Sequence, residues 1–233
     1  MKTVVQRIID TTLPHHCLLC DSRHCQNQPI CQHCHAALPV IKHACQQCGI
    51  PLKREQARCG RCIKKPPYYS TSTIPYHYEH PIDRLIQALK FDAKIGVAQL
   101  LGKQIAKQRL NHGSTPLPQC IIPVPLHRSR LRERGFNQSL EIARAISEHL
   151  DITLNYQSCQ RNRPTATQTS LPAAQRSANL RNAFSAVSIE EVDHVAIVDD
   201  VVTTGHTANE LARLLRRGGI KIVEVWAAAR AGR

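Results

Sequence analysis

The stretch that most constrains the fold of this 233-residue chain is VAIVDDVVTTGHTANE, residues 195–210. It opens with residues 195–198, a short apolar run rich in β-branched side chains, which is typical of a strand buried on both faces. Asp199 and Asp200 close that run with two adjacent carboxylates. A loop rich in hydroxyls follows, and then an amphipathic stretch with leucines at helical spacing. This order predicts a ligand site at the carboxyl end of a strand in an α/β sheet.

The loop between the acidic pair and the helix has the composition of a phosphate-binding turn. Backbone N–H groups at the start of a helix point toward an anion, and a glycine allows the chain to approach it closely. An ordinary strand that ends in a solvated acidic turn would not need the hydroxyls, the glycine and the carboxylates together. We therefore expect the loop residues to hold a phosphate; they are Thr203, Thr204, Gly205, His206 and Thr207.

This stretch resembles the signature with which type I phosphoribosyltransferases bind 5-phosphoribosyl 1-pyrophosphate (PRPP). The resemblance implies that Asp199 and Asp200 are the catalytic carboxylates and bind the ribose 2′- and 3′-hydroxyls. It implies that the loop 203–207 cradles the 5′-phosphate, and that Mg²⁺ accompanies the PRPP.

Eleven cysteines form the second constraint, and eight of them stand in four CxxC pairs. The start of the chain does not have the pattern of a secretory signal, so metal binding is a better explanation than disulfides. Two CxxC turns place four thiolates around one tetrahedral zinc ion, so two zinc ions are expected. The expected ligands are Cys17, Cys20, Cys31, Cys34, Cys45, Cys48, Cys59 and Cys62.

The spacing of these pairs favours a duplicated zinc ribbon over residues 1–66. Ten residues separate Cys20 from Cys31, and ten separate Cys48 from Cys59, which favours sequential pairing of the knuckles. An interleaved arrangement, with the first and third knuckles sharing an ion, stays open. Four nearby residues are alternative ligands but are expected on the surface of the module; they are Cys25, His33, His35 and His43.

Composition bounds the partners and the location of the protein. The formal net charge is +14, which favours a polyanionic partner and exceeds what PRPP alone would need. No apolar run has the length of a membrane span, so a cytoplasmic location is the default expectation.

After a linker at residues 64–67, residues 67–233 predict a second domain. We expect an edge strand or hairpin over 68–78, helices near 82–91, 97–110 and 140–150, and strands at 120–126, 152–158 and after Gly219. Alternating strands and helices indicate an α/β fold with a mostly parallel sheet.

Two basic stretches supply candidate anion contacts. The segment HRSRLRERGFNQS is expected to form a loop that grips pyrophosphate or a nucleic-acid backbone. No acid occurs over residues 152–189, which predicts a mobile anion-facing loop with a short helix. A solvated charged face and a flexible linker are the plainer alternatives. The candidate contacts are Arg128, Arg130, Arg132, Arg134, Phe136, Arg161 and Arg163, with Arg176 and Arg181 in the second stretch.

Across nearly its whole length the chain resembles the ComF/GntX family. The resemblance rests on the four knuckles followed in order by YEHPIDRLIQALKF, PVPLHRSRLRERGFNQS, RPTATQTSLPAAQRSANLRNAF and IVDDVVTTGHT. It implies an N-terminal double zinc-ribbon module joined to a type I phosphoribosyltransferase-like domain. It also implies a role in natural transformation, with single-stranded DNA and other transformation proteins as partners.

Three functions remain open at this point. The first is handling of single-stranded DNA, with Phe136 or the pair Tyr68 and Tyr69 stacking on bases. The second is a GntX-like phosphoribosyltransferase that acts on an unknown acceptor without a DNA role. The third is a zinc adaptor that kept the fold without catalysis.

Overall fold

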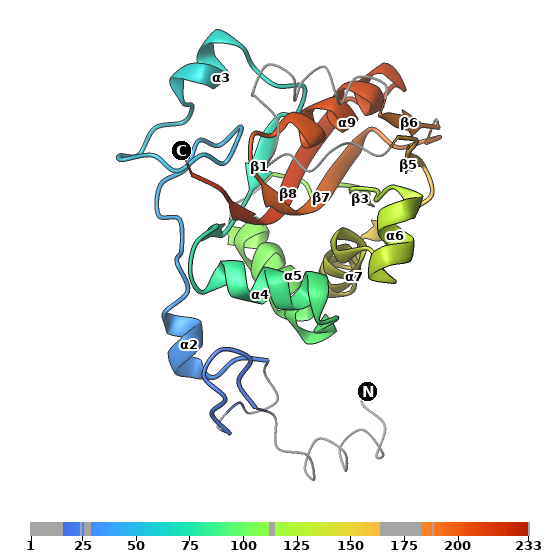
Figure 1. Cartoon of the computed structure of the whole chain (residues 1–233). Coiled ribbons are helices and arrows are strands. Elements are labelled where there is room, and N and C mark those ends of the chain that lie inside the picture. Colours follow the sequence, from blue (N-terminus) through green and yellow to red (C-terminus); the bar gives the residue numbers. More distant parts are fainter. Residues whose placement is uncertain are drawn as a thin grey trace.

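A parallel sheet forms the centre of the computed structural model, which describes residues 16–23, 25, 29–111, 115–163, 183–187 and 189–232. The strand order is β1-β8-β7-β3-β4, and β2 also pairs with β8 (Figure 1). All of these pairings are parallel, so the predicted α/β sheet is confirmed. The strands are β1 (Thr71–Thr73), β2 (Tyr76–His77), β3 (Cys120–Pro123), β4 (Thr153–Leu154), β7 (His194–Val202) and β8 (Ile222–Arg230).

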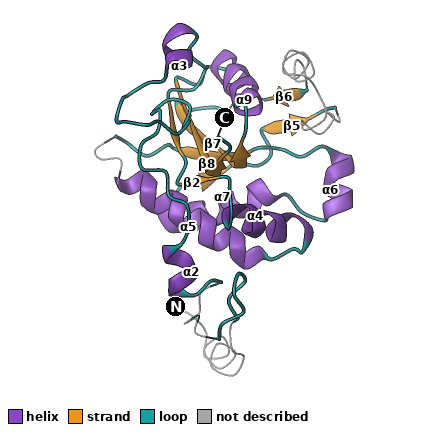
Figure 2. Cartoon of the chain, turned by 60° about the vertical axis from the view of Figure 1, so that its left-hand side comes forward, coloured by secondary structure: helices purple, strands orange, loops and turns teal. Residues whose placement is uncertain are grey.

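Helices cover the sheet on both faces, as Figures 1 and 2 show. One face packs against α4 (Ile82–Phe91), α5 (Ile95–Asn111) and α7 (Gln138–Leu150), and the other against α9 (His206–Arg217). Along β7, Ala196 and Val198 belong to the first core, whereas Val195 and Ile197 belong to the second. Successive side chains of a strand point to opposite faces, so an unbroken apolar run is what a strand between two helical layers requires.

Strand β7 is longer than the sequence pattern indicated. The acidic pair was expected to end the strand, but β7 continues through Asp199 and Asp200 to Val202. The reason is its neighbour β8, which pairs with it up to Val202 opposite Arg230. The two carboxylates are therefore held by a strand backbone and not by a turn.

Other predicted elements need smaller corrections. The segment 68–78 forms the predicted edge of the sheet and not a hairpin, because β1 and β2 both run parallel to β8. The strand expected over 152–158 is reduced to β4. Residues 159–161 and 184–186 form an antiparallel pair, β5 (Cys159–Arg161) and β6 (Phe184–Ala186). The expected short helix and the arginines at 176 and 181 lie outside the described residues.

The two halves of the cysteine module pack on different parts of the molecule. The first half, which carries α2 (Gln32–Ala36), lies against α5, where His35 Nε2 is 3.0 Å from Gln104 Nε2. The second half, which carries α3 (Gly60–Lys64), lies beside β1, where the Ser72 N–H donates to the carbonyl of Gln46. In Figure 1, α2 and α3 lie at opposite ends of the molecule. A boundary near residue 66 stays a prediction.

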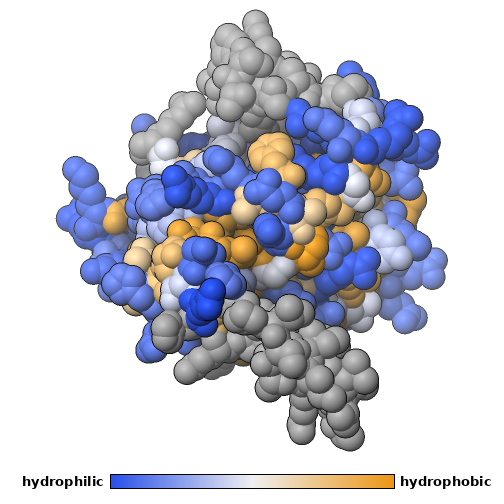
Figure 3. Space-filling view, turned by 60° about the horizontal axis from the view of Figure 1, so that its bottom comes forward, coloured by the Kyte–Doolittle hydropathy of each residue, from blue (hydrophilic) through white to orange (hydrophobic). Residues whose placement is uncertain are grey.

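The face of the molecule that Figure 3 draws is largely polar where its residues are described. Figure 3 views the face that lies at the bottom of Figure 1, where hydrophilic side chains surround a band of apolar ones. Within the described part of the chain, no helix combines the length and the apolarity needed to cross a membrane.

Helices α5 and α7 cross closely at Gly102. A Cβ atom added there would lie 2.6 Å from Ala145 Cβ and 2.9 Å from the carbonyl oxygen of Ile142. Overpacking of a tight contact costs roughly 1–3 kcal/mol. Only glycine lets these two backbones approach so closely.

We predict that Gly102→Ala lowers the free energy of unfolding despite the better helix propensity of alanine, which favours it by roughly 1 kcal/mol at an unstrained site. The matched control is Gly96→Ala in the same helix, where the added Cβ would lie 3.7 Å from Pro29 Cβ. Urea denaturation of both variants measures the difference. Equal stability of the two variants would show that the crossing of α5 and α7 accommodates a methyl group at position 102.

Candidate functional site

The acidic pair on β7 is held by side chains from α7 and α4. Asp199 Oδ1 accepts hydrogen bonds from Ser139 Oγ at 3.1 Å and from the backbone N–H of Asp200 at 2.9 Å. Asp200 Oδ1 accepts from Gln138 Nε2 at 3.0 Å. Its second oxygen, Oδ2, forms an ion pair with the ammonium of Lys90 at the end of α4. Two carboxylates from one strand are thus fixed by the start of α7 and by one lysine.

Burial gives this pair unusual electrostatics. Loss of water and the neighbouring Asp200 carboxylate raise the pKa of Asp199 to about 7, against the opposing effects of the Asp200 N–H, Lys90 and Ser139. Asp200 itself is 4% exposed. A cation or a pair of hydroxyl donors would relieve this charge, because either stabilises the ionised form of both groups. The donor set is all oxygen, which suits Mg²⁺.

The loop after β7 leads into the start of α9. Gly205 caps α9 with φ of +80°, and a Cβ there would lie 3.3 Å from the hydroxyl oxygen of Tyr69. Helix α9 begins at His206 and has no acid in its first turn. Its first N–H groups and its macrodipole favour a negative ligand.

These groups line one cleft of about 210 Å³ at the carboxyl ends of β3 and β7. The structure therefore brings the predicted acids, the predicted phosphate loop 203–207 and Arg161 together. Burial lowers the pKa of Arg161, and the nearby carboxylate of Asp199 opposes that shift. The walls add polar groups that sequence reasoning did not assign to a site: Lys90, Gln138 and Ser139.

The four arginines after β3 do not lie on a loop. They form α6 (Arg128–Arg134), where the His127 side chain accepts from the Ser129 N–H and Gly135 ends the helix with φ of +81°. In a helix, residues four apart share a face, so the alternation places Arg128 with Arg132 and Arg130 with Arg134. The prediction that this segment forms a loop was therefore wrong.

Of these arginines, Arg134 reaches the acidic pair indirectly. Its Nη1 donates to Gln138 Oε1 at 2.5 Å, and Gln138 in turn donates to Asp200. Its guanidinium also lies 5.6 Å from the centre of the Phe91 ring. Arg128, Arg132 and Arg163 are exposed.

A second cavity of about 510 Å³ adjoins the cleft, and we call it the α6 groove. Leu126 and Arg161 line both cavities. The α6 groove is also lined by Arg128, Phe136 and Tyr156, and Tyr156 is 52% exposed. Tyr69, in contrast, is 3% exposed, so the predicted stacking of a base on Tyr69 is wrong.

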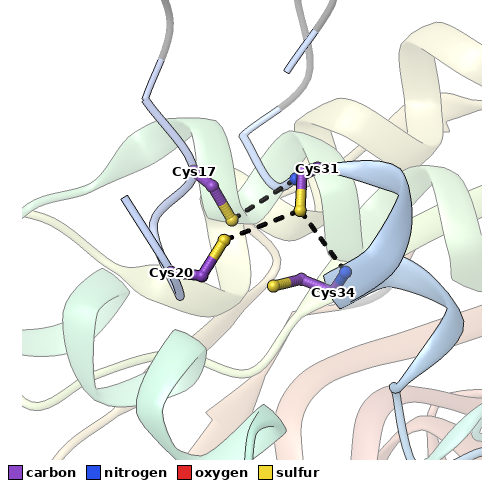
Figure 4. A group of neighbouring side chains, drawn as sticks. All are labelled: Cys17, Cys20, Cys31 and Cys34. Atoms are coloured by element: carbon purple, nitrogen blue, oxygen red, sulfur yellow. Dashed lines mark hydrogen bonds between the residues drawn. The ribbon is translucent and has the colours of Figure 1, made fainter. Parts of the chain in front are cut away.

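The eight knuckle cysteines gather into two groups of four. One contains Cys17, Cys20, Cys31 and Cys34 (Figure 4), and the other contains Cys45, Cys48, Cys59 and Cys62. The four sulfur atoms of each group lie within 4.8 Å of one another. Sequential pairing is confirmed, and the interleaved alternative is wrong.

The two groups repeat the same local geometry. The Cys31 N–H donates to Cys17 Sγ at 3.3 Å, and the Cys59 N–H donates to Cys45 Sγ at 3.3 Å. Burial opposes ionisation of the two acceptors, but backbone donors outweigh it and lower the pKa of Cys17 to about 6 and of Cys45 to about 7. Burial and the neighbouring sulfurs raise the pKa of Cys34 and Cys62. Only a bound cation makes four such thiolates compatible, and zinc fits the donor set.

The alternative ligands take no part in these groups. His33, His35 and His43 are exposed, as expected. Cys25 was expected on the surface but is 2% exposed, and its thiol points to the carbonyl of Ser22.

Comparison with known proteins agrees with both halves of the chain. A model of the double zinc ribbon domain matches residues 8–63, and a model of the phosphoribosyl transferase domain matches residues 137–233. Competence protein F of Haemophilus influenzae is 37% identical over 92% of this chain and 96% of its own length. The chain belongs to the ComF/GntX family.

Other relatives support this assignment. The DNA utilization protein YhgH of Shigella flexneri is 39% identical over 86% of this chain and 90% of its own length. Competence protein ComFC of Bacillus subtilis is 25% identical over 87% and 89% of the two chains. These ComF/GntX relatives align with this chain over most of their length.

The raised pKa of Asp199 predicts a pH-dependent cost of this site to stability. Between its ordinary pKa of 3.8 and its folded value of about 7, the folded state retains a proton that the unfolded state loses. Stability from this group therefore falls as pH rises through that window. Asp199→Asn removes the cost and keeps an oxygen to accept the same two hydrogen bonds.

We expect Asp199→Asn to raise the melting temperature relative to wild type at pH 8, and to raise it less at pH 6. The gain in the free energy of unfolding should differ by about 1 kcal/mol between the two pH values. Thermal unfolding monitored by circular dichroism tests this. Asp193→Asn, which removes an exposed carboxylate paired with Lys221, is the control and should show no such pH dependence. A pH-independent effect of Asp199→Asn would contradict the burial argument.

Proposed function

We propose that the cleft binds PRPP together with Mg²⁺, and that the protein uses this site while handling single-stranded DNA in natural transformation. The observation that carries the proposal is the cleft itself. Two carboxylates at the carboxyl end of a central strand face the acid-free start of a helix, within one cavity. A ligand with hydroxyls at one end and a phosphate at the other matches that arrangement.

The ligand would lie along β7 and the loop that follows it. Asp199 and Asp200 would accept the ribose hydroxyls, and the loop 203–207 would hold the 5′-phosphate. Arg161, the one arginine among the described residues that line the cleft, would face the pyrophosphate. A Mg²⁺ ion would neutralise pyrophosphate oxygens and make it a better leaving group.

Lys90 has a defined part in this proposal. Its ammonium neutralises Asp200 through the ion pair on Oδ2. A metal or a ribose hydroxyl that approaches this oxygen must share it with the lysine or displace it. Lys90 therefore balances the negative charge of this carboxylate, while Gln138 holds the opposite oxygen.

The proposed DNA surface is the α6 groove with the exposed face of α6. Phosphates would meet Arg128 and Arg132, and a base would stack against Phe136 or Tyr156. The net charge of +14 favours such a partner. The names of two relatives, a competence protein and a DNA utilization protein, point the same way. Because the groove adjoins the cleft, a DNA segment and PRPP could be bound together.

The PRPP proposal predicts that Asp199→Asn with Asp200→Asn abolishes binding of PRPP in Mg²⁺. Each charge-assisted hydrogen bond contributes roughly 1.5–3 kcal/mol, so loss of two weakens affinity by about two to four orders of magnitude. Isothermal titration calorimetry measures this, with Asp193→Asn as the control. Equal PRPP affinity in the double variant and wild type would place the ligand elsewhere.

The same double variant also tests whether the site acts in the cell. A strain carrying the double variant should lose transformation if PRPP binding matters there. Normal transformation by a variant that no longer binds PRPP would favour the zinc adaptor. Release of pyrophosphate with a candidate acceptor would favour a transferase.

The DNA proposal predicts that Arg128→Ala with Arg132→Ala weakens binding of a single-stranded oligonucleotide and flattens its salt dependence. Each lost phosphate contact lowers the slope of log K against log salt by about 0.7 for single strands. Fluorescence anisotropy at several salt concentrations measures both quantities. Arg134 is left intact because it supports Gln138.

The matched control removes two exposed lysines that are also four residues apart, by Lys103→Ala with Lys107→Ala in α5. It changes the net charge equally and should leave the slope closer to wild type. Tyr156→Ala should weaken binding without altering the slope, because stacking releases no counterions. If the arginine and lysine pairs behave alike, net charge and not α6 governs the interaction.

A further inference from the structure

Arg230, the last residue of β8, joins two parts of the molecule that the sequence places far apart. Its side chain is buried, with 1% of the residue exposed. Its Nε donates to the carbonyl of Cys48 at 3.0 Å. Its Nη1 donates to the carbonyls of Val202 at 3.0 Å, Ala231 at 2.8 Å and Thr203.

Each end of this connection belongs to a site already described. Cys48 is a ligand in the second four-cysteine group. Val202 ends β7, and Thr203 begins the loop that lines the cleft. A guanidinium is a rigid planar fork, so the distance between its two sets of acceptors is fixed. The position of the loop backbone is therefore tied to the position of the zinc knuckle.

A second contact runs between the same two parts. Gln47, also in the knuckle, donates from Nε2 to the carbonyl of Tyr69 at 3.1 Å. The hydroxyl of Tyr69 in turn lies against Gly205, 3.3 Å from where a Cβ would be. The knuckle thus supports the start of the loop through Arg230 and its glycine through Tyr69.

The first four-cysteine group offers an internal comparison. It has the same knuckle geometry, but it packs against α5 through His35 and Gln104. Helix α5 is not among the elements that line the cleft. Any effect specific to the second group therefore cannot be a general effect of zinc on folding.

We propose that Arg230 is a positioning residue that holds the phosphate-binding loop in place only while the second four-cysteine group binds its metal. The metal fixes the backbone of the knuckle, including the Cys48 carbonyl, because a structural zinc site supplies its own folding energy. Without the metal the knuckle loosens, and the loop loses a fixed acceptor for its arginine. The inference rests on the proposed binding of PRPP in the cleft. It makes the second zinc ribbon part of that site.

The first test changes Arg230 itself. Arg230→Gln should retain both zinc ions and weaken the affinity for PRPP with Mg²⁺ by about tenfold to a hundredfold, because the loop backbone would leave its binding position. Arg230→Lys keeps the charge, but one ammonium cannot span both sets of carbonyls, so it should restore little of the affinity.

The matched control is Arg109→Gln. Arg109 is equally buried, with 2% exposed, but it bonds Glu224 near the amino end of β8. It should lower the melting temperature without changing PRPP affinity. If Arg109→Gln weakens PRPP binding as much as Arg230→Gln does, the effect is general destabilisation and the proposal fails. Full rescue by Arg230→Lys would also overturn it.

The second test removes each metal in turn and does not depend on the folding of Arg230 variants. Cys48→Ser with Cys62→Ser should lower zinc content from two to one per chain and weaken PRPP binding. Cys20→Ser with Cys34→Ser should remove one zinc and leave PRPP affinity unchanged. Equal effects of the two pairs would refute the coupling.

Hydrogen exchange separates failure of this inference from failure of the proposed function. In the absence of any ligand, peptides covering residues 199–210 should exchange faster in Arg230→Gln and in the second-group variant than in wild type or the first-group variant. If wild type does not bind PRPP but this exchange pattern is found, the proposed ligand is wrong and the coupling stands. Unchanged exchange in all variants would overturn the coupling even if PRPP binds.

Discussion

Two carboxylates at adjacent positions of a buried central strand are the constraint to which the rest of the site responds. Adjacent residues of a strand point to opposite faces, yet both Asp199 and Asp200 reach side chains at the start of α7. Burial alone would force one of them to stay protonated. Lys90, Gln138 and Ser139 offset part of that cost, and they come from two helices that pack on the same face of the sheet. The packing of α4 and α7 therefore places the groups that oppose the rise in the pKa of Asp199.

The end of the cleft at the start of α9 favours negative charge in a ligand, whereas the acidic pair favours positive charge or hydrogen-bond donors. Helix α9 begins there with no acid in its first turn, and its strongly basic last turn lies at the other end of the helix. One short segment thus juxtaposes buried negative charge and a helix start that favours a negative ligand. Such an arrangement costs stability without a ligand, and functional sites commonly carry this kind of cost.

How far the sequence predicted this site depends on whether the signal was local. The strand, the acids, the loop and the start of α9 lie within 16 residues, and all of them were predicted in order. Helix α6 was missed because the alternation of arginines outweighed its high helix propensity and the glycine at its end, both of which were readable. Lys90 could not be assigned in the same way. It meets Asp200 only because α4 packs on the face of the sheet that contains β7, and no local sequence pattern records that packing.

The zinc ribbons show the same distinction most clearly. Their ligands follow from spacing, and the duplicated gap correctly predicted sequential pairing. Nothing in that spacing distinguishes the two groups, and the structure gives them different neighbours. The first rests on α5, whereas the second shares Arg230 with the loop after β7. Because a buried guanidinium must satisfy its donors wherever it lies, its carbonyl partners in the knuckle and in the loop are bound to a common geometry. The second ribbon is therefore better described as a support for the loop that lines the cleft than as an appended module.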